Sequence, residues 1–375
     1  MGNFFDDNGQ ILDDYLKISL LPGSRADYVQ GGGGNTSCKF DERMMAIKAS
    51  GFKLSQIERD NSYAVLDHSV ISAFYRGNEP EQFGDVEGAG SAAAKSSVIE
   101  IPGLPVLRPS VEAGFHSLLE RFVLHTHPVY ANLAACSAEG RDIAAKALKD
   151  ADYSFGYVNY IDPGAKLTFA IRDEQERVLR ETGKRPSAIF MQNHGFIATH
   201  DDAQRCIEIH DEVNKLIAEE FGVNDSDFPS IALREVRYGS NDENVLYMSN
   251  TPHVINAAME QEHDISFYCE DSLYPDQLVF LAGNITIFET ELPKDMKDWA
   301  ANKCTIYKGT GDVVYSCSRE EAQTIEETIA AITFITSNIR KSGKTVITMS
   351  DSGKNFISGW ESEKYRKSLL NGESK

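Results

Sequence analysis

"FVLHTHPVYANLA" runs from Phe122 to Ala134 and places two histidines at the end of an apolar run. The run predicts a buried strand, and the proline after it favours the end of the strand at that point. Side chains two residues apart on a strand project to the same face, so His125 and His127 are expected to lie together. Two imidazoles in that position can share one divalent metal ion or form a hydrogen-bonded pair, and the pattern alone leaves both interpretations open.

The size and charge of the chain limit the kind of protein it can be. Its 375 residues suffice for one large or two ordinary domains, and 41% hydrophobic and 25% charged residues are typical of a soluble globular protein. The formal net charge of −20 argues against a nucleic-acid partner, which needs a basic face. It still permits a small phosphorylated substrate, which needs only a local positive field.

The N-terminal segment and the cysteines predict a cytoplasmic location. The start, "MGNFFDDNGQ", lacks the basic and apolar regions of a secretory signal, and no apolar run reaches the length of a membrane span. The six cysteines are scattered without a C-x-x-C pair. We therefore expect reduced thiols, with neither a zinc site nor a disulfide framework built from them, and no membrane partner.

A third histidine occurs in the same kind of position. "SAIFMQNHG" predicts a buried strand that ends at glycine, with His194 at its end. Open α/β sheets build sites at strand ends, and three histidines with an open position suit Lewis-acid chemistry. Glu112 falls in the first turn of a helix predicted from Pro109 to Arg121, with Ser110 as its N-cap. Its carboxylate can complement the helix dipole, ligate the metal, or act as a base beside it.

A glycine run precedes these elements. "VQGGGGNTSCKFDERMMAIKASGFKL" (Val29 to Leu54) predicts a glycine loop followed by two short strands, Thr36 to Phe40 and Met44 to Ala49. The loop is neither a P-loop nor a dinucleotide-binding fingerprint. Successive glycines nevertheless let backbone N–H groups converge on an anion.

Taken in order, "GGGGNTS", "ASG", "PSVE", "HTHP" and "NHG" resemble the motifs of the class II aldolase/adducin family, which includes L-fuculose-phosphate aldolase. The likeness covers about Leu16 to Gly222. The full layout looks closest to the aldolase half of the bifunctional rhamnulose-phosphate aldolase/dehydrogenase proteins. The resemblance implies a three-layer α/β/α fold with a central, mainly antiparallel sheet.

The resemblance also implies roles for individual residues. His125, His127 and His194 match the metal-binding histidines, usually of Zn²⁺, although Mn²⁺ or Co²⁺ also suits such ligands. Glu112 matches the carboxylate that binds the empty metal site and becomes the proton-transfer base when substrate arrives. The positions that match the phosphate-binding loops are Gly34, Asn35, Ser50, Gly51 and Ser110.

Some positions depart from the family pattern or have no assigned role. The Ser-Ser pair that commonly precedes the glutamate is Ser110-Val111 here, and a threonine of the glycine loop corresponds to Gly32. His116 lies one helical turn after Glu112, so it can orient that carboxylate or simply pack in the helix. Tyr160 is a candidate acid for the leaving alkoxide, or a packed tyrosine. Family members often take that acid from a neighbouring subunit.

The chain divides by texture into residues 1–250, the metal-binding domain, and residues 251–375, a C-terminal α/β extension of unknown role. In the first part, "GDVEGAGSAAAKSS" predicts an exposed, mobile loop within Glu81 to Ser97. In the second, "YPDQLVFLAG" and "CTIYKGTGDVVYSCS" predict strands, and "REEAQTIEETIAAITFITSNIRKSG" predicts a long helix.

The resemblance implies a class II aldolase that cleaves or forms a C–C bond of a phosphorylated ketose through a metal-stabilised enediolate. The same site can serve a 4-epimerase, a dehydratase or a decarboxylase. A non-catalytic scaffold, as in adducin, is the alternative of another class, and the intact histidines and glutamate favour the enzyme. Expected partners are a small phosphorylated sugar or aldehyde and further copies of the chain, a homo-oligomer that the resemblance implies is a tetramer.

Overall fold

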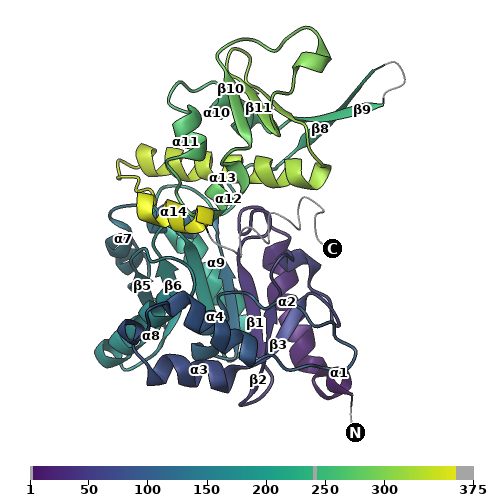
Figure 1. Ribbon diagram of the computed structural model, residues 1–375. Coiled ribbons are helices and arrows are strands. Elements are labelled where there is room, and N and C mark those ends of the chain that lie inside the picture. Colours follow the sequence, from purple (N-terminus) through teal and green to yellow (C-terminus); the bar gives the residue numbers. More distant parts are fainter. Residues whose placement is uncertain (1–2, 240–242, 360–375) are drawn as a thin grey trace.

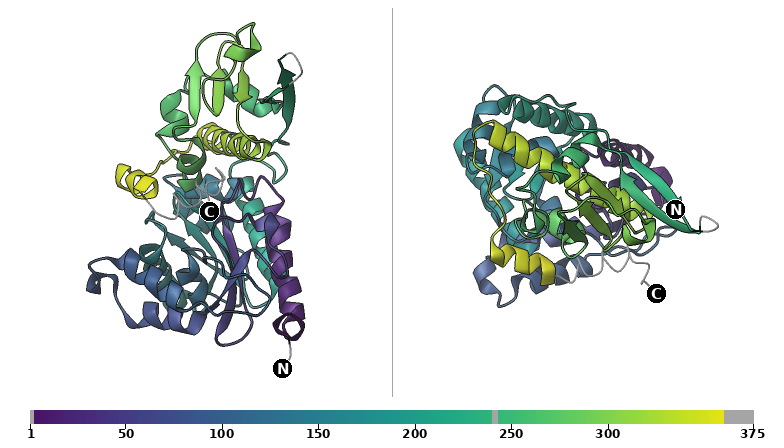
Figure 2. Two further views of the ribbon diagram at one scale, coloured as in Figure 1. Left: turned by 45° about the vertical axis from the view of Figure 1, so that its right-hand side comes forward. Right: turned by 90° about the horizontal axis from the view of Figure 1, so that it is seen from above.

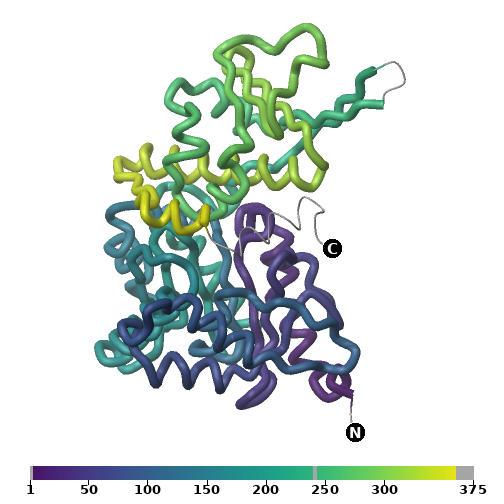
Figure 3. Tube along the Cα trace, in the orientation of Figure 1, coloured from purple at the N-terminus to yellow at the C-terminus, as the bar shows by residue number. Residues whose placement is uncertain are grey.

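The computed structural model describes residues 3–239 and 243–359, so the end of the predicted extension, residues 360–375, lies outside the described residues. Two sheets, each with its own helices, are stacked end to end (Figure 1). The tube in Figure 3 shows that the first part of the chain builds the lower body and the later part builds the upper one.

The lower body contains a seven-stranded sheet in the order β3-β2-β1-β4-β7-β6-β5. Its strands are β1 (Asn35–Lys39), β2 (Met44–Lys48), β3 (Tyr63–Asp67), β4 (Phe122–Thr126), β5 (Ser154–Val158), β6 (Pro186–Met191) and β7 (Gly195–His200). Neighbouring strands are antiparallel except β5 and β6, which are parallel. This pairing confirms the predicted, mainly antiparallel sheet.

Helices cover both faces of this sheet. They are α1 (Phe4–Asp7), α2 (Gly9–Gly23), α3 (His68–Gly77), α4 (Val86–Ser96), α5 (Ala113–Leu118), α6 (Val129–Ala135), α7 (Gly140–Ala147), α8 (Ala165–Thr182) and α9 (Ala203–Glu220), with 3₁₀ turns at Leu54–Gln56 and Pro80–Gln82. On β4, Leu124 packs in the cluster that includes α2 and α9, whereas Val123 packs in the cluster of α5 and α8. This alternation places one helical layer on each face, which confirms the three-layer α/β/α fold.

The upper body is a five-stranded sheet in the order β10-β11-β12-β9-β8. Its elements are β8 (Leu233–Tyr238), β9 (Asn244–Ser249), α10 (Pro252–Ala258), α11 (Ile265–Cys269), α12 (Pro275–Leu281), β10 (Ile285–Phe288), a 3₁₀ turn (Met296–Asp298), β11 (Cys304–Tyr307), β12 (Asp312–Tyr315), α13 (Arg319–Lys341) and α14 (Asp351–Gly359). Since β8 and β9 precede residue 250, strands of the second sheet begin before the predicted domain boundary, and the division at 250 stays a prediction.

Helix α13 joins the two bodies. Figure 2 shows it lying between the second sheet and the lower body. Its ring of Phe334 meets that of Tyr130 on α6 edge to face, with centroids 5.7 Å apart. Residues of α13, α12, α6 and the first sheet belong to one buried hydrophobic cluster. The extension therefore shares a continuous core with the sheet that carries the histidines.

The predicted mobile loop within Glu81 to Ser97 is wrong for most of its length, because α4 occupies Val86–Ser96. Its alanines have high helix propensity, and the side chain of Asp85 accepts a hydrogen bond from the Gly88 N–H as an N-cap. Glu87 accepts hydrogen bonds from the N–H groups of Ala165 and Lys166, which ties α4 to the start of α8. The prediction weighed polarity alone and overlooked these local signals.

The predicted strand in "YPDQLVFLAG" is also wrong, because Pro275–Leu281 form α12. All seven residues of this helix are buried, so the sequence shows an apolar run without a polar face. Short buried helices and strands share that pattern. Proline at N1 and aspartate beside it are helix-start signals, and these give the correct assignment.

Two further predictions can be compared with the structure. All six cysteines are free thiols, as expected. Among the described helices, none combines the length and the apolar character needed to cross a membrane.

We expect Leu124→Ala to lower the free energy of unfolding by about 2–5 kcal/mol, because the Leu124 side chain is fully buried and its removal leaves a cavity in the core. Leu21→Ala is the matched control, since this side chain on α2 is 52% exposed and its loss should change stability by no more than about 0.5 kcal/mol. Urea denaturation followed by circular dichroism measures both. Equal effects of the two substitutions would contradict the assigned layer packing.

Candidate metal centre

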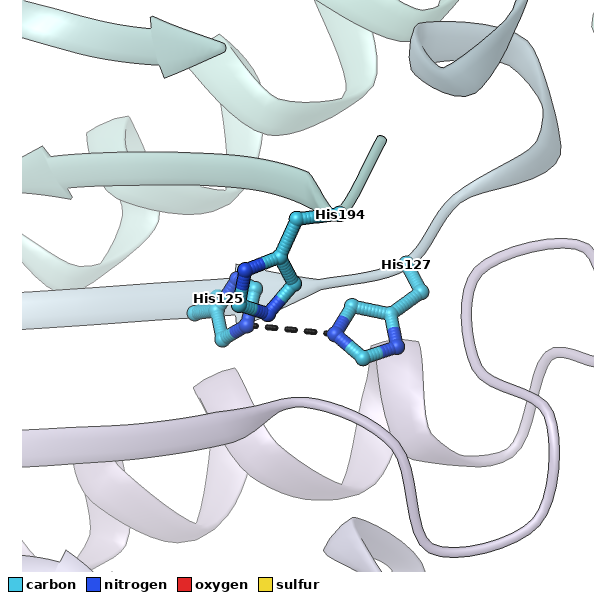
Figure 4. Close-up of side chains that lie close together, drawn as sticks. All are labelled: His125, His127 and His194. Carbon is cyan, nitrogen blue, oxygen red and sulfur yellow. Dashed lines mark hydrogen bonds between the residues drawn. The ribbon is translucent and has the colours of Figure 1, made fainter. Parts of the chain in front are cut away.

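The predicted histidines meet at one end of the first sheet. His125 is the penultimate residue of β4, His127 follows the strand, and His194 immediately precedes β7. Figure 4 shows the three imidazoles turned toward one another. Strands β4 and β7 are antiparallel neighbours, so the end of one meets the beginning of the other. The sheet thus brings together residues that lie almost 70 positions apart, and the pairing of His194 with the others agrees with the prediction.

Two of the imidazoles are held in a defined tautomer by their Nδ1 atoms. His125 Nδ1 lies 3.0 Å from the Phe196 carbonyl oxygen, and His127 Nδ1 lies 2.5 Å from Asp276 Oδ2. Carbonyl and ionised carboxylate oxygens only accept hydrogen bonds, so each Nδ1 must carry the proton. In the neutral rings, each Nε2 then presents a lone pair.

These two Nε2 atoms lie 3.3 Å apart and face each other. Two bare lone pairs at that distance repel, and a cation between them, either a metal ion or a shared proton, removes the conflict. Two nitrogens that bind one tetrahedral zinc ion at about 2.1 Å lie about 3.4 Å apart. His194 completes a set of three ligand atoms that all lie within 4.8 Å of one another. The donor set therefore fits a divalent metal.

Glu112 lies beside two of the three imidazoles. Its Oε2 lies 3.6 Å from His125 Nε2, and its Oε1 lies 3.4 Å from His194 Nε2. Glu112 also accepts a hydrogen bond from the side-chain N–H of Asn35. The strand register places Asn35 there, because Asn35 on β1 pairs directly with His125 on β4. The carboxylate can thus act as a fourth ligand or as a base beside the metal.

Burial sets the charges of this group. It lowers the pKa of His125 to about 4 and that of His194 to about 3, so both imidazoles are neutral and able to ligate at neutral pH. Burial alone would raise the pKa of Glu112, but His125, His194 and the Asn35 amide together lower it to about 2. Neutral imidazoles around an ionised carboxylate are the protonation states that a divalent metal requires.

His116 supports Glu112 through an intermediary. Its Nε2 contacts Asn35 Oδ1, and its Nδ1 lies 2.7 Å from the hydroxyl of Ser37. Asn35 connects the two side chains, because its amide oxygen contacts His116 and its amide nitrogen donates to Glu112. His116 is fully buried, and burial lowers its pKa.

The five predicted phosphate-loop positions come together from three segments. Asn35 begins β1, and Gly34 immediately precedes it. The Ser50–Gly51 turn lies against the segment of Ser110, because Ser50 donates to the carbonyls of Arg108 and Pro109. Ser110 accepts hydrogen bonds from Asn35 and from the Glu112 N–H. Ser110 is not the N-cap of α5, since the helix is shorter than predicted and Glu112 holds that position. The phosphate-binding role of the five positions stays a prediction.

Tyr160 lies at the same end of the sheet but in a different contact. Its backbone N–H donates to Gln192, in the turn that carries His194, at 3.0 Å. Its ring packs against Gly353 of α14, where an added Cβ would lie 2.6 Å from the hydroxyl. Burial raises the pKa of Tyr160. Within the described residues, no hydrogen bond or ring contact joins it to the three histidines, so the acid role stays a prediction.

The sequence did not reveal two residues that shape this site. Asp276, which contacts His127, lies about 150 positions away in a helix that was predicted as a strand. Asn193 adopts a left-handed conformation, with φ of +50°, in the turn before His194. Its side chain donates to the carbonyls of Leu273 and Ile347, both at 2.9 Å. Asparagine tolerates positive φ, so Asn193 was the one residue in the sequence that could have indicated a left-handed turn here.

The fold, the three histidines and the glutamate define the class of protein: an α/β/α protein with a candidate metal centre at one end of its first sheet. The model of the class II aldolase and adducin N-terminal domain matches residues 19–219, more than half of the chain, and the chain belongs to this family. A search of curated proteins finds no match.

Solved structures with a similar fold are distant in sequence. The N-terminal class II aldolase domain of a Thermoplasma acidophilum protein is 22% identical, covers 56% of this chain and 92% of its own, and has a TM-score of 0.46. A sugar-phosphate aldolase from Thermotoga maritima is 15% identical, with 58% and 97% coverage and a TM-score of 0.41. An L-fuculose 1-phosphate aldolase is 18% identical, with 58% and 91% coverage and a TM-score of 0.38.

We expect Asn193→Gly to lower the free energy of unfolding by about 1–3 kcal/mol, because two carbonyls, one buried and one partly buried, lose their donor. Asn193→Ala should cost roughly 1 kcal/mol more, because alanine at positive φ adds backbone strain. Urea denaturation of the two variants beside the wild type separates the contributions. Identical stability of the alanine and glycine variants would rule out strain at this turn.

Proposed function

We propose that this protein is a divalent-metal-dependent class II aldolase, a carbon–carbon lyase acting on a phosphorylated ketose. The observation that carries the proposal is the convergence of the Nε2 atoms of His125 and His127, 3.3 Å apart, with His194 and the carboxylate of Glu112 beside them. Membership of the class II aldolase/adducin family supports the same reaction class.

In this proposal the residues have separate roles. His125, His127 and His194 hold the metal, which we expect to be Zn²⁺ or another divalent ion such as Mn²⁺ or Co²⁺. The bound ion would polarise the ketose carbonyl and stabilise the negative charge that develops as the bond between the third and fourth carbons breaks. Glu112, already ionised and within reach of two of the imidazoles, moves the proton at the enediolate carbon.

Substrate binding completes the proposal. Backbone N–H groups at Gly34 and Gly51, with the side chains of Asn35, Ser50 and Ser110, would hold the phosphate. The products would be a dihydroxyacetone-phosphate-like fragment and an aldehyde. The acid for the leaving alkoxide would be Tyr160 or a residue of a neighbouring subunit in a homo-oligomer, with a tetramer as the starting expectation. The free cysteines suit a reducing compartment, and we place the protein in the cytoplasm.

The same residues would also serve a sugar-phosphate 4-epimerase, a dehydratase or a decarboxylase, since each needs the same stabilised charge. An adducin-like scaffold is the other alternative. Burying three imidazoles and a carboxylate costs free energy unless they are paired or bind a metal, and a scaffold would gain nothing from keeping them. We therefore favour the enzyme.

The first test is the metal content of the purified protein beside that of His127→Ala. We expect about one equivalent of a divalent ion per chain in the wild type and its loss in the variant, because one of three ligands is removed. A panel of 1-phosphorylated 2-ketoses is then screened for release of an aldehyde. A wild type that binds no metal, even with excess zinc, would contradict both the aldolase and the epimerase proposals.

Glu112→Gln separates proton transfer from metal binding. Because the three histidines remain, we expect the variant to retain the metal and to lose about 10²-fold or more in kcat. Metal analysis and steady-state kinetics on the same preparation measure both quantities. Full activity in this variant would contradict the assignment of Glu112 as the base.

A further inference from the structure

The C-terminal extension reaches the metal centre through α12. Asp276, in the first turn of this helix, is 1% exposed, and its Oδ2 lies 2.5 Å from His127 Nδ1. The residues matched by the family model end at 219, so this carboxylate comes from outside the matched domain. A buried acid at this position cannot be explained as a solvated surface group.

The surroundings of Asp276 hold it in place. Tyr274 donates its hydroxyl hydrogen to Gln30, next to the glycine loop, at 3.2 Å. Gln277 accepts from the N–H of Leu273 at 2.8 Å and donates to the carbonyl of Phe267 at 2.8 Å. Residues on both sides of Asp276 are therefore held by hydrogen bonds.

The glycine loop is shaped to admit this carboxylate. A Cβ added at Gly33 would lie 2.2 Å from Asp276 Oδ2 and 2.9 Å from His127 Nδ1, so any side chain there would displace the pair. Neighbouring Gly32 has open space, with nothing within 4 Å of an added Cβ. The requirement for glycine at residue 33 therefore arises from the contact between Asp276 and His127.

The extension also anchors the turn that carries His194. Asn193 donates its two side-chain hydrogen bonds to the carbonyls of Leu273, just before α12, and Ile347, just before α14. His127 and His194 thus both depend on residues from beyond the family domain. His125, in contrast, is oriented within the first sheet by Phe196.

We propose that the C-terminal extension is part of the metal centre and that Asp276 is a positioning residue for His127. The carboxylate accepts the hydrogen bond from Nδ1–H, fixes the tautomer and the ring orientation, and so presents Nε2 to the metal. This inference rests on the proposed metal-dependent function. Loss of such a partner of a ligating histidine typically weakens metal binding by about 10- to 100-fold.

The test measures the Zn²⁺ dissociation constant of the full chain by competition with a chromophoric chelator. We expect Asp276→Ala to weaken binding by about 10- to 100-fold and Asp276→Asn to weaken it less, because the amide oxygen still accepts a hydrogen bond. Asp271→Asn is the matched control, since it removes the same charge from an exposed residue five positions earlier, and its affinity should equal that of the wild type. The visible spectrum of the Co²⁺-loaded protein reports ligand geometry and should change in Asp276→Ala but not in Asp271→Asn.

A second pair of variants tests the contact from the other side. Gly33→Ala should weaken Zn²⁺ binding as Asp276→Ala does, whereas Gly32→Ala should leave it unchanged. If Asp276→Ala fails to fold, Gly33→Ala and Asp276→Asn carry the test. A wild type that binds zinc while Asp276→Asn and Gly33→Ala bind it equally well would overturn the inference and leave the proposed function intact. A wild type that binds no zinc would remove the proposed function and the inference with it.

Discussion

The site depends on one electrostatic constraint: two buried imidazole nitrogens, Nε2 of His125 and Nε2 of His127, face each other at 3.3 Å. The Nδ1 protons are committed to the Phe196 carbonyl and to Asp276. Burial of unpaired polar atoms costs free energy, and a cation between the nitrogens, either a metal ion or a shared proton, would remove that cost. The carboxylate of Glu112 lies beside the same group, with its Oε2 3.6 Å from His125 Nε2.

The sheet supplies the geometry that this constraint needs. The antiparallel pairing of β1 with β4 sets Asn35 opposite His125, and the pairing of β4 with β7 brings His194 to the end of β4. Because Asn35 contacts both Glu112 and His116, a single strand register orients both side chains. The pairing of β1, β4 and β7 thus brings together side chains that no continuous segment of the chain could place side by side.

The C-terminal extension packs against the family domain and contributes a side chain to the candidate site. Its α13 continues the hydrophobic core of the first sheet, and its α12 places a buried carboxylate beside His127 of the candidate metal centre. A second body attached only by a linker would impose no requirement on the glycine loop, whereas here Gly33 must lack a side chain. The two sheets therefore act as one unit around the site.

The sequence by itself determined the parts with a local signal: the two histidines two positions apart on a strand, the histidine before a glycine at the end of the next apolar run, the acid ahead of them, and the three-layer fold through the family motifs. It misjudged α4, where composition hid helix propensity, and α12, where a fully buried helix has no polar face to show its period. Only the tertiary structure decided that Asp276 orients His127 and that Asn35 links His116 to Glu112. The reason is physical: hydrogen bonds between segments far apart in the chain depend on the register and packing of the whole fold, and these leave no pattern at either residue.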